Sequence, residues 1–279
     1  MSGERPRSLV DAAARIVATA DLEEKVELAF ATAKAWFSRR LSLSTGAIDA
    51  TMPERPGRPA RPELVPPRDL PKRSTGSEAG RLALLHSLCH IELNAVDLTW
   101  DLVGRFRDVA MPRSFYDNWV QVGLEEAKHF SMLARRLEAA GSFYGALPAH
   151  DGLWQATQET GHDLLARLAI LPLVLEARGL DVTPPLIDRL REVGDEAGAA
   201  ILDVIYRDER RHVAFGCKWF RFLCDRRGLP PEPTFRRLVI RHFRGPLKPP
   251  FNDAARAEAG MTPGFYRPLV RPLAGSTLH

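Results

Sequence analysis

The stretch RDERRHVAF, residues 207–215, contains Glu-x-x-His at residues 209–212, and the same spacing occurs at residues 126–129. Side chains at positions i and i+3 share one face of a helix, so each Glu–His pair can point at one spot. A lone glutamate precedes each motif at a matched distance, Glu92 by 34 residues and Glu176 by 33. The repeated pattern therefore predicts four helices that direct carboxylate and imidazole groups into a shared interior.

The predicted metal ligands are two imidazoles and four carboxylates. They are Glu92, Glu126, His129, Glu176, Glu209 and His212. A glutamate from each of two helices and Glu-x-x-His from each of two others is the ligand set of carboxylate-bridged di-iron and di-manganese proteins. Each of these acids falls within an apolar stripe, where an uncompensated buried carboxylate is destabilising. A pair of divalent cations would supply the missing charge. We predict two iron ions, with manganese or a mixed manganese–iron pair as alternatives.

Proline content divides the chain around a helical block. Helical periodicity extends over residues 77–228, for which we predict an all-α, ferritin-like four-helix bundle. Residues 1–50 are predicted to form an N-terminal helical extension, in which Asp21 and Glu24 form a capping box. Residues 51–76 form a predicted proline-rich linker, because seven of the 22 prolines lie in its first 22 positions.

A second proline-rich segment, residues 229–279, follows the helical block. It holds nine prolines between residues 230 and 272. We predict a largely irregular C-terminal tail packed on the bundle, with one short helix at DAARAEAG, residues 253–260.

The third helix of the bundle depends on geometry rather than on a motif. If Glu176 and Glu209 lie at one level of an antiparallel pair, the turn falls near Gly194. The stretch GLDVTPP, residues 179–185, then lies inside the helix, and we expect a kink or short interruption there. Glu159 remains an alternative to Glu176 as the fourth acid.

Further polar residues flank the two motifs. Asp208 and Glu125 each precede a predicted ligand, and such an acid can accept the free ring N–H of a metal-bound histidine. Arg211 can pair with that acid, although the same residues also fit a surface ion pair. Cys89 and Tyr206 each lie one helical turn before a predicted ligand and are candidates for the pocket wall, with core packing as the alternative for Cys89.

The composition limits the classes of partner. A net charge of +4 is spread over 39 basic and 35 acidic residues, which does not favour a nucleic-acid partner. No apolar run reaches the roughly 20 residues that span a bilayer, so we expect no membrane segment. The N-terminus lacks the apolar core of a secretory signal. Three cysteines form neither a disulfide framework nor a zinc motif, and we expect a cytoplasmic protein.

Several of these stretches look like known families. DExRH at residues 208–212 resembles the di-iron signature of bacterial multicomponent monooxygenases and ribonucleotide reductase relatives. A closer resemblance is to the ferritin-like proteins grouped as domain of unknown function family 455. The stretches that carry it are GRPARPELVPPRDLP (57–71), HIELNAVDL (90–98), RDERRHVAFGCKWF (207–220) and GPLKPPFNDAAR (245–256). This resemblance extends over roughly residues 10–265 and implies a ferritin-like bundle with a metal site at the six residues named above. A tRNA-hydroxylating ferritin-like family shares the ligand plan more distantly.

The ligand set and the resemblance together favour an O2-activating di-iron oxidase or oxygenase. Carboxylate ligands suit ferric iron, and the protein would place a small-molecule substrate beside the ions. An iron-handling ferroxidase or storage protein and a tRNA-hydroxylase-like enzyme are the alternatives. About 125 residues beyond the bundle argue against storage. The substrate, the electron donor, any catalytic residue other than the ligands, and the assembly state, including a homodimer, stay open.

Overall fold

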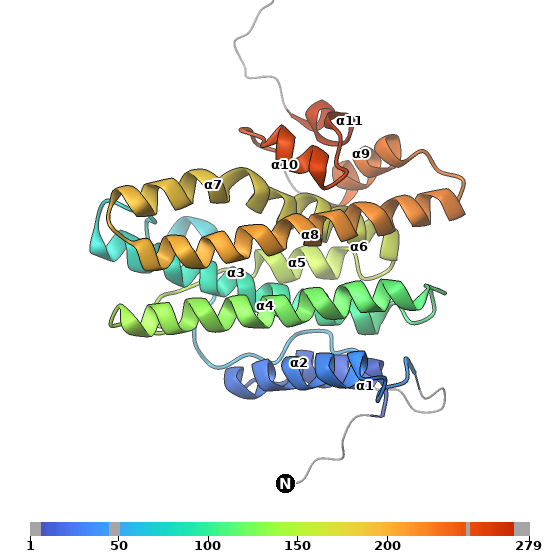
Figure 1. The fold of residues 1–279 in the computed structure, drawn as a ribbon, viewed down its shortest axis with the longest axis horizontal. Helices are drawn as coiled ribbons and strands as arrows, with labels where there is room; N and C mark the ends of the chain where they lie inside the picture. The colour runs from blue at the N-terminus through green and yellow to red at the C-terminus, as the bar shows by residue number, and fades with distance from the viewer. Residues whose placement is uncertain (1–6, 45–50, 244–245, 271–279) are drawn as a thin grey trace, which may run out of the picture.

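The computed structural model describes residues 7–44, 51–243 and 246–270. Apart from two isolated β-bridges, the regular elements in these ranges are helices (Figure 1), which confirms the all-α prediction. Within them no helix combines the length and apolar character that a bilayer crossing requires. Residues 1–6, 45–50 and 271–279, at the edges of the predicted N-terminal extension and tail, lie outside the described residues.

Two antiparallel helix pairs form the centre of the molecule. Helix α3 (Glu78–Arg105) pairs with α4 (Arg113–Ala139), and α7 (Ala177–Glu192) pairs with α8 (Glu196–Arg226). The pairs pack against each other through α4 and α8, with α5 (Gly152–Glu159) in the crossover between them. This arrangement is compatible with the predicted bundle.

The turn between α7 and α8 lies where the ligand spacing predicted it. Gly194 has φ +78°, a left-handed conformation that glycine adopts without steric cost. The Asp195 side chain then accepts the Gly198 N–H at 2.9 Å and caps α8. The chain also turns between the end of α3 and Pro112, which directly precedes α4.

The third helix differs from the prediction in where it is irregular. Residues 179–185 contain no interruption, because α7 continues through Pro184 and Pro185. The Leu180 carbonyl, which an N–H at position 184 would normally bond, instead accepts the Asn252 side-chain amide at 3.2 Å. A tertiary contact thus satisfies the carbonyl that proline leaves free, and the helix persists.

The irregularity lies earlier, between α6 (Leu164–Ile170) and α7. Residues Leu171–Glu176 form a π-helical turn, η2. Its second residue, Pro172, has no N–H to donate, and it packs against α8 at Gly216. A Cβ atom at Gly216 would lie 2.5 Å from the Pro172 Cβ, so this close approach requires glycine. Such wide turns occur frequently at functional sites, and this one ends at Glu176.

The N-terminal helices cover the opposite face of the α3–α4 pair (Figure 1). Helix α1 (Leu9–Ala18) contacts α3, and α2 (Leu22–Phe37) contacts α4. Asp21 accepts the Glu24 N–H at 2.8 Å, as the capping box predicts. The described residues between α2 and α3 contain one helical turn, η1 (Pro67–Asp69), and Arg58 forms an ion pair with Asp97 of α3 at 2.7 Å.

The C-terminal segment is more helical than predicted. It contains α9 (Pro231–His242), α10 (Asp253–Glu258), α11 (Pro263–Tyr266) and η3 (Arg267–Leu269), of which only α10 was expected. The prediction failed because prolines begin two of these helices, and the first turn of a helix tolerates proline. Phe235 of α9 and Phe265 of α11 pack edge-on against Phe220 of α8, which anchors the segment to the central helices.

Candidate metal centre

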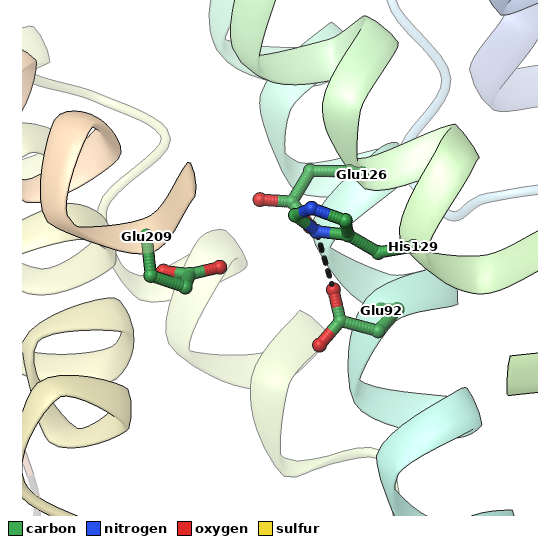
Figure 2. Close-up of side chains that lie close together, drawn as sticks. All are labelled: Glu92, Glu126, His129 and Glu209. Carbon is green, nitrogen blue, oxygen red and sulfur yellow. Dashed lines mark ion pairs between the residues drawn. The ribbon is translucent and has the colours of Figure 1, made fainter. Parts of the chain in front are cut away.

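The structure brings the six predicted ligands together from four helical segments. Glu92 comes from α3, Glu126 and His129 from α4, Glu176 from the end of η2, and Glu209 and His212 from α8. They form two groups, in each of which one ligand atom per residue lies within 4.8 Å of the others. The first group is Glu92, Glu126, His129 and Glu209, and the second is Glu176, Glu209 and His212. Figure 2 shows the first group, with Glu209 facing the other three side chains from across the interior.

Most polar atoms of this cluster make no hydrogen bond to the described residues and face one another instead, as His129 Nδ1 faces Glu92 Oε2 at 3.3 Å. Eight buried nitrogen and oxygen atoms of the six residues have no hydrogen bond among the described residues. They are Glu92 Oε2, both carboxylate oxygens of Glu126 and of Glu176, Glu209 Oε2, and Nδ1 of His129 and His212. An unsatisfied buried polar group costs about 1–3 kcal/mol. A cation bound by these oxygen and nitrogen donors would remove that cost, so the residues present fit a metal ion.

The histidines are oriented by acids from the opposite helix. Nε2 of His129 on α4 lies 3.0 Å from Asp208 Oδ2 on α8, and Nε2 of His212 on α8 lies 2.8 Å from Glu125 Oε2 on α4. Each acid directly precedes a glutamate of the cluster and holds the histidine of the other motif. The crossed pairs keep a proton on both Nε2 atoms and leave both Nδ1 atoms facing the carboxylates.

Basic side chains join the crossed pairs at the protein surface. Arg211 donates to Glu125 and, at 3.1 Å, to Asp208. Lys128 Nζ lies 2.5 Å from Asp208 Oδ2, and Gln121 donates to Glu125 at 2.6 Å. Burial opposes ionisation of Glu125 and Asp208. Their hydrogen bonds to these neighbours and to the histidines outweigh burial and keep the pKa of both acids below its usual value, so both are ionised.

The cluster itself has strongly perturbed pKa values. Burial raises the pKa of Glu92 to about 8 and also raises the pKa of Glu176 and Glu209. Burial opposes ionisation of Glu126 as well, but the two neighbouring imidazoles hold its pKa below the usual range. Burial disfavours the charged form of His129, yet Asp208 and the adjacent carboxylates raise its pKa to about 11. Without a cation, the site therefore holds protons that a metal must displace.

A cavity of about 180 Å3 adjoins the cluster. Three of the clustered acids line it: Glu92, Glu176 and Glu209. Ten of its sixteen lining residues are leucine, isoleucine, valine or alanine, contributed mainly by α3, η2, α7 and α8. Sequence reasoning missed Gly179 and Thr183 in this wall because it treated residues 179–185 as a kink or short interruption, and it gave Arg178, directly before that stretch, no role.

Three residues considered from the sequence lie elsewhere. Neither Cys89 nor Tyr206 is among the residues that line the cavity. The Cys89 thiol belongs to an apolar cluster with Phe130 of α4, where burial raises its pKa, and the Tyr206 hydroxyl accepts the Asn252 amide at 3.2 Å. Glu159 ends α5 and belongs to neither ligand group, whereas Glu176 does.

Comparison with known proteins finds a family and a relative. A family model described as "Protein of unknown function (DUF455)" matches residues 18–267. A Haemophilus influenzae protein described as uncharacterized is 41% identical over 209 residues, covering 73% of this chain and 73% of the relative. No solved structure matches the chain significantly.

Proposed function

The chain belongs to the protein family of unknown function DUF455, and from its site we propose that it is a ferritin-like, di-iron, O2-activating oxidase or oxygenase. The observation that carries this proposal is the convergence on one interior space of eight buried atoms, from six residues, that make no hydrogen bond to the described residues. The two ligand groups share Glu209, which supports a pair of ions rather than one. The paired α3–α4 and α7–α8 helices support a ferritin-like four-helix bundle.

The residues of the site would have distinct roles in holding the ions. Glu209 belongs to both groups, and Glu126 lies between the imidazoles, 3.5 Å from His129 Nδ1 and 3.0 Å from His212 Nδ1. These two carboxylates are therefore placed to be shared, while Glu92 and Glu176 each serve one side. Asp208 and Glu125 hold the Nε2 protons, which would leave the Nδ1 lone pairs available to a bound ion. Bound iron would supply the redox chemistry that reduces O2.

The adjoining cavity favours an enzyme over an iron-storage protein. Its wall is mainly apolar, and three of the acids at its inner end are proposed ligands. An apolar chamber can hold a carbon substrate beside the ions and exclude water from them. A path for many hydrated ions would instead be lined with polar groups, because ions are costly to transfer to apolar surroundings.

An iron-loading experiment tests this proposal. The protein is loaded with ferrous iron without O2, desalted, and then exposed to O2 while metal content and absorbance are followed. We expect about two irons per chain, one round of O2-dependent oxidation and no mineral growth. The Glu126→Ala, Glu209→Ala double variant is the control, and it should be helical by circular dichroism but contain no iron.

Two outcomes would reject the proposal. Uptake of many irons per chain with continued mineral growth would indicate storage. Wild-type iron content in the double variant would mean that the metal binds elsewhere.

A further inference from the structure

The cavity beside the proposed metal site suits a compact apolar molecule. Its volume of about 180 Å3 slightly exceeds the roughly 150 Å3 of an engineered cavity that binds benzene. Leu88, Ile91, Leu175 and Ile205 are typical of its wall. A single ring with a short substituent, or a branched chain of similar size, would fill it.

One basic residue lies at the mouth of this cavity. Arg178 is the sole lysine, arginine or histidine among the described residues that line it, and its side chain is 39% exposed. The carbonyl oxygens of Lys248 and Pro250 accept hydrogen bonds from Arg178 Nη1 at 2.7 and 3.1 Å. These neutral acceptors on the C-terminal segment position the guanidinium without compensating its charge.

Among the described residues, the one acid that forms an ion pair with Arg178 is Asp181, which is already paired with another arginine. Asp181 Oδ2 lies 3.4 Å from Arg178 Nη1, a long contact. Arg256 is buried and binds both oxygens of Asp181, at 2.8 and 2.7 Å. One carboxylate thus faces two guanidinium groups, which leaves a net positive charge at the cavity mouth. The hydrogen bonds of Arg178 to described residues all use Nη1, so Nε and Nη2 can bind a ligand.

We propose that the substrate is a small organic acid whose apolar body fills this cavity and whose carboxylate pairs with Arg178 at the mouth. A guanidinium binds a carboxylate in a planar, two-bond geometry, which would fix one end of the molecule. The opposite, apolar end would then face Glu92, Glu176 and Glu209. This inference rests on the proposed function in one respect: it calls the bound molecule a substrate. Binding of the organic acid itself requires no turnover and can be measured separately.

Calorimetric titration without O2 separates this binding from the proposed chemistry. The probes are 4-ethylbenzoate and 4-ethylbenzamide, which have nearly the same shape but differ in charge, and the protein carries its metal. We expect the benzoate to bind at least about tenfold more tightly than the benzamide, as for a hydrogen bond to a charged group. Arg178→Met should remove this preference and leave benzamide affinity within about twofold.

Matched variants separate charge from shape. Arg178→Lys keeps the charge and should retain part of the preference, whereas Arg189→Met, at an exposed arginine of α7 outside the cavity wall, should change nothing. Gly179→Leu should weaken the binding of both probes about tenfold or more, because Gly179 lines the cavity and a larger side chain there would occupy part of it. The backbone accepts the change, since a Cβ atom at this position has only Thr183 Oγ1 as a neighbour, 4.0 Å away.

Three results would overturn the inference. Equal affinities for the two probes would exclude recognition of the charge, and an unchanged preference in Arg178→Met would exclude Arg178, as expected if the carboxylate bound the metal directly. Full affinity in Gly179→Leu would exclude the cavity. If the probes bind as expected but iron-loaded protein does not react with O2, the ligand class stands and the proposed oxidase function fails.

Discussion

At the scale of single residues, the two histidines of the cluster depend on acids that are distant in sequence. Asp208 bonds His129 and Glu125 bonds His212, so each motif on one helix is oriented from the other helix. Arg211 contacts both acids and couples the two pairs. The arrangement determines which ring nitrogen is available as a ligand, because a proton held at Nε2 leaves the lone pair on Nδ1.

Asp208→Ala should leave the metal bound but weaken its affinity about 10–100-fold, the usual effect of losing a partner that orients a histidine. Competition with a chelator of known affinity measures this change. Asp203→Ala is the matched control, because Asp203 also lies on α8 but pairs with Arg191 at the surface. Equal metal affinity in the two variants would show that Asp208 has no part in positioning His129.

The choice between two candidate acids can also be tested at this scale. Glu176→Gln should lower metal affinity sharply, since it removes a negative ligand from the second group. Glu159→Gln should have no effect, because Glu159 is exposed at the end of α5. Elemental analysis of both variants after desalting is the measurement, and a sensitive Glu159 with a silent Glu176 would contradict the assignment.

At the scale of elements, the π-helical turn η2 packs directly against helix α8. Pro172 and Gly216 approach closely enough that no side chain fits between them. This contact sets the position of η2 against α8, and hence the level at which Glu176 meets Glu209. Helix α7 follows directly, and its proline-freed carbonyl at Leu180 is satisfied from the C-terminal segment.

Gly216→Ala should destabilise the protein by about 1–3 kcal/mol, as overpacking does, and reduce its metal content. Gly179→Ala is the control, a second helical glycine at which a new Cβ meets only Thr183 Oγ1 at 4.0 Å. That variant should be as stable as wild type or up to about 1 kcal/mol more stable, from helix propensity. Denaturant unfolding of both proteins provides the comparison, and similar unfolding free energies would argue against the Pro172 contact.

At the scale of the whole molecule, the buried cluster makes stability depend on bound metal. Buried carboxylate and imidazole atoms that make no hydrogen bond to the described residues lie at the centre of the paired helices. Any ion that binds only the folded chain stabilises it, by about 2.7 kcal/mol at a free concentration one hundred times the dissociation constant.

Removal of the metal with a chelator should therefore lower the melting temperature by roughly 5 °C for a chain of this size. Calorimetric scans before and after dialysis measure the shift. The Glu126→Ala, Glu209→Ala variant should show no shift, and a wild-type protein that is equally unaffected would contradict a structural contribution from the metal.

The metal-free protein should also lose stability as the pH rises. The pKa of Glu92 is raised to about 8, and the pKa of His129 is raised to about 11. Protonation of groups whose pKa is higher in the folded state stabilises that state, and this contribution disappears as the pH increases through the folded pKa. The melting temperature without metal should fall between about pH 5 and pH 8, starting from the unfolded pKa of a glutamate. A melting temperature that rises over this interval would contradict the raised pKa of Glu92.

Local patterns in the sequence determined much of this protein. The two Glu-x-x-His motifs, the upstream Glu92 and Glu176 and the turn at Gly194 follow from helical spacing and backbone preference, which depend on residues near one another in the chain. The crossed pairing of Asp208 and Glu125 and the persistence of α7 through its prolines were decided only by the tertiary structure. The position of Arg178 at the cavity mouth was likewise decided only by the tertiary structure. Each of these depends on surfaces far apart in sequence, such as Asn252 against Leu180 and Arg256 against Asp181, and spacing along the chain carries no information about which of them meet.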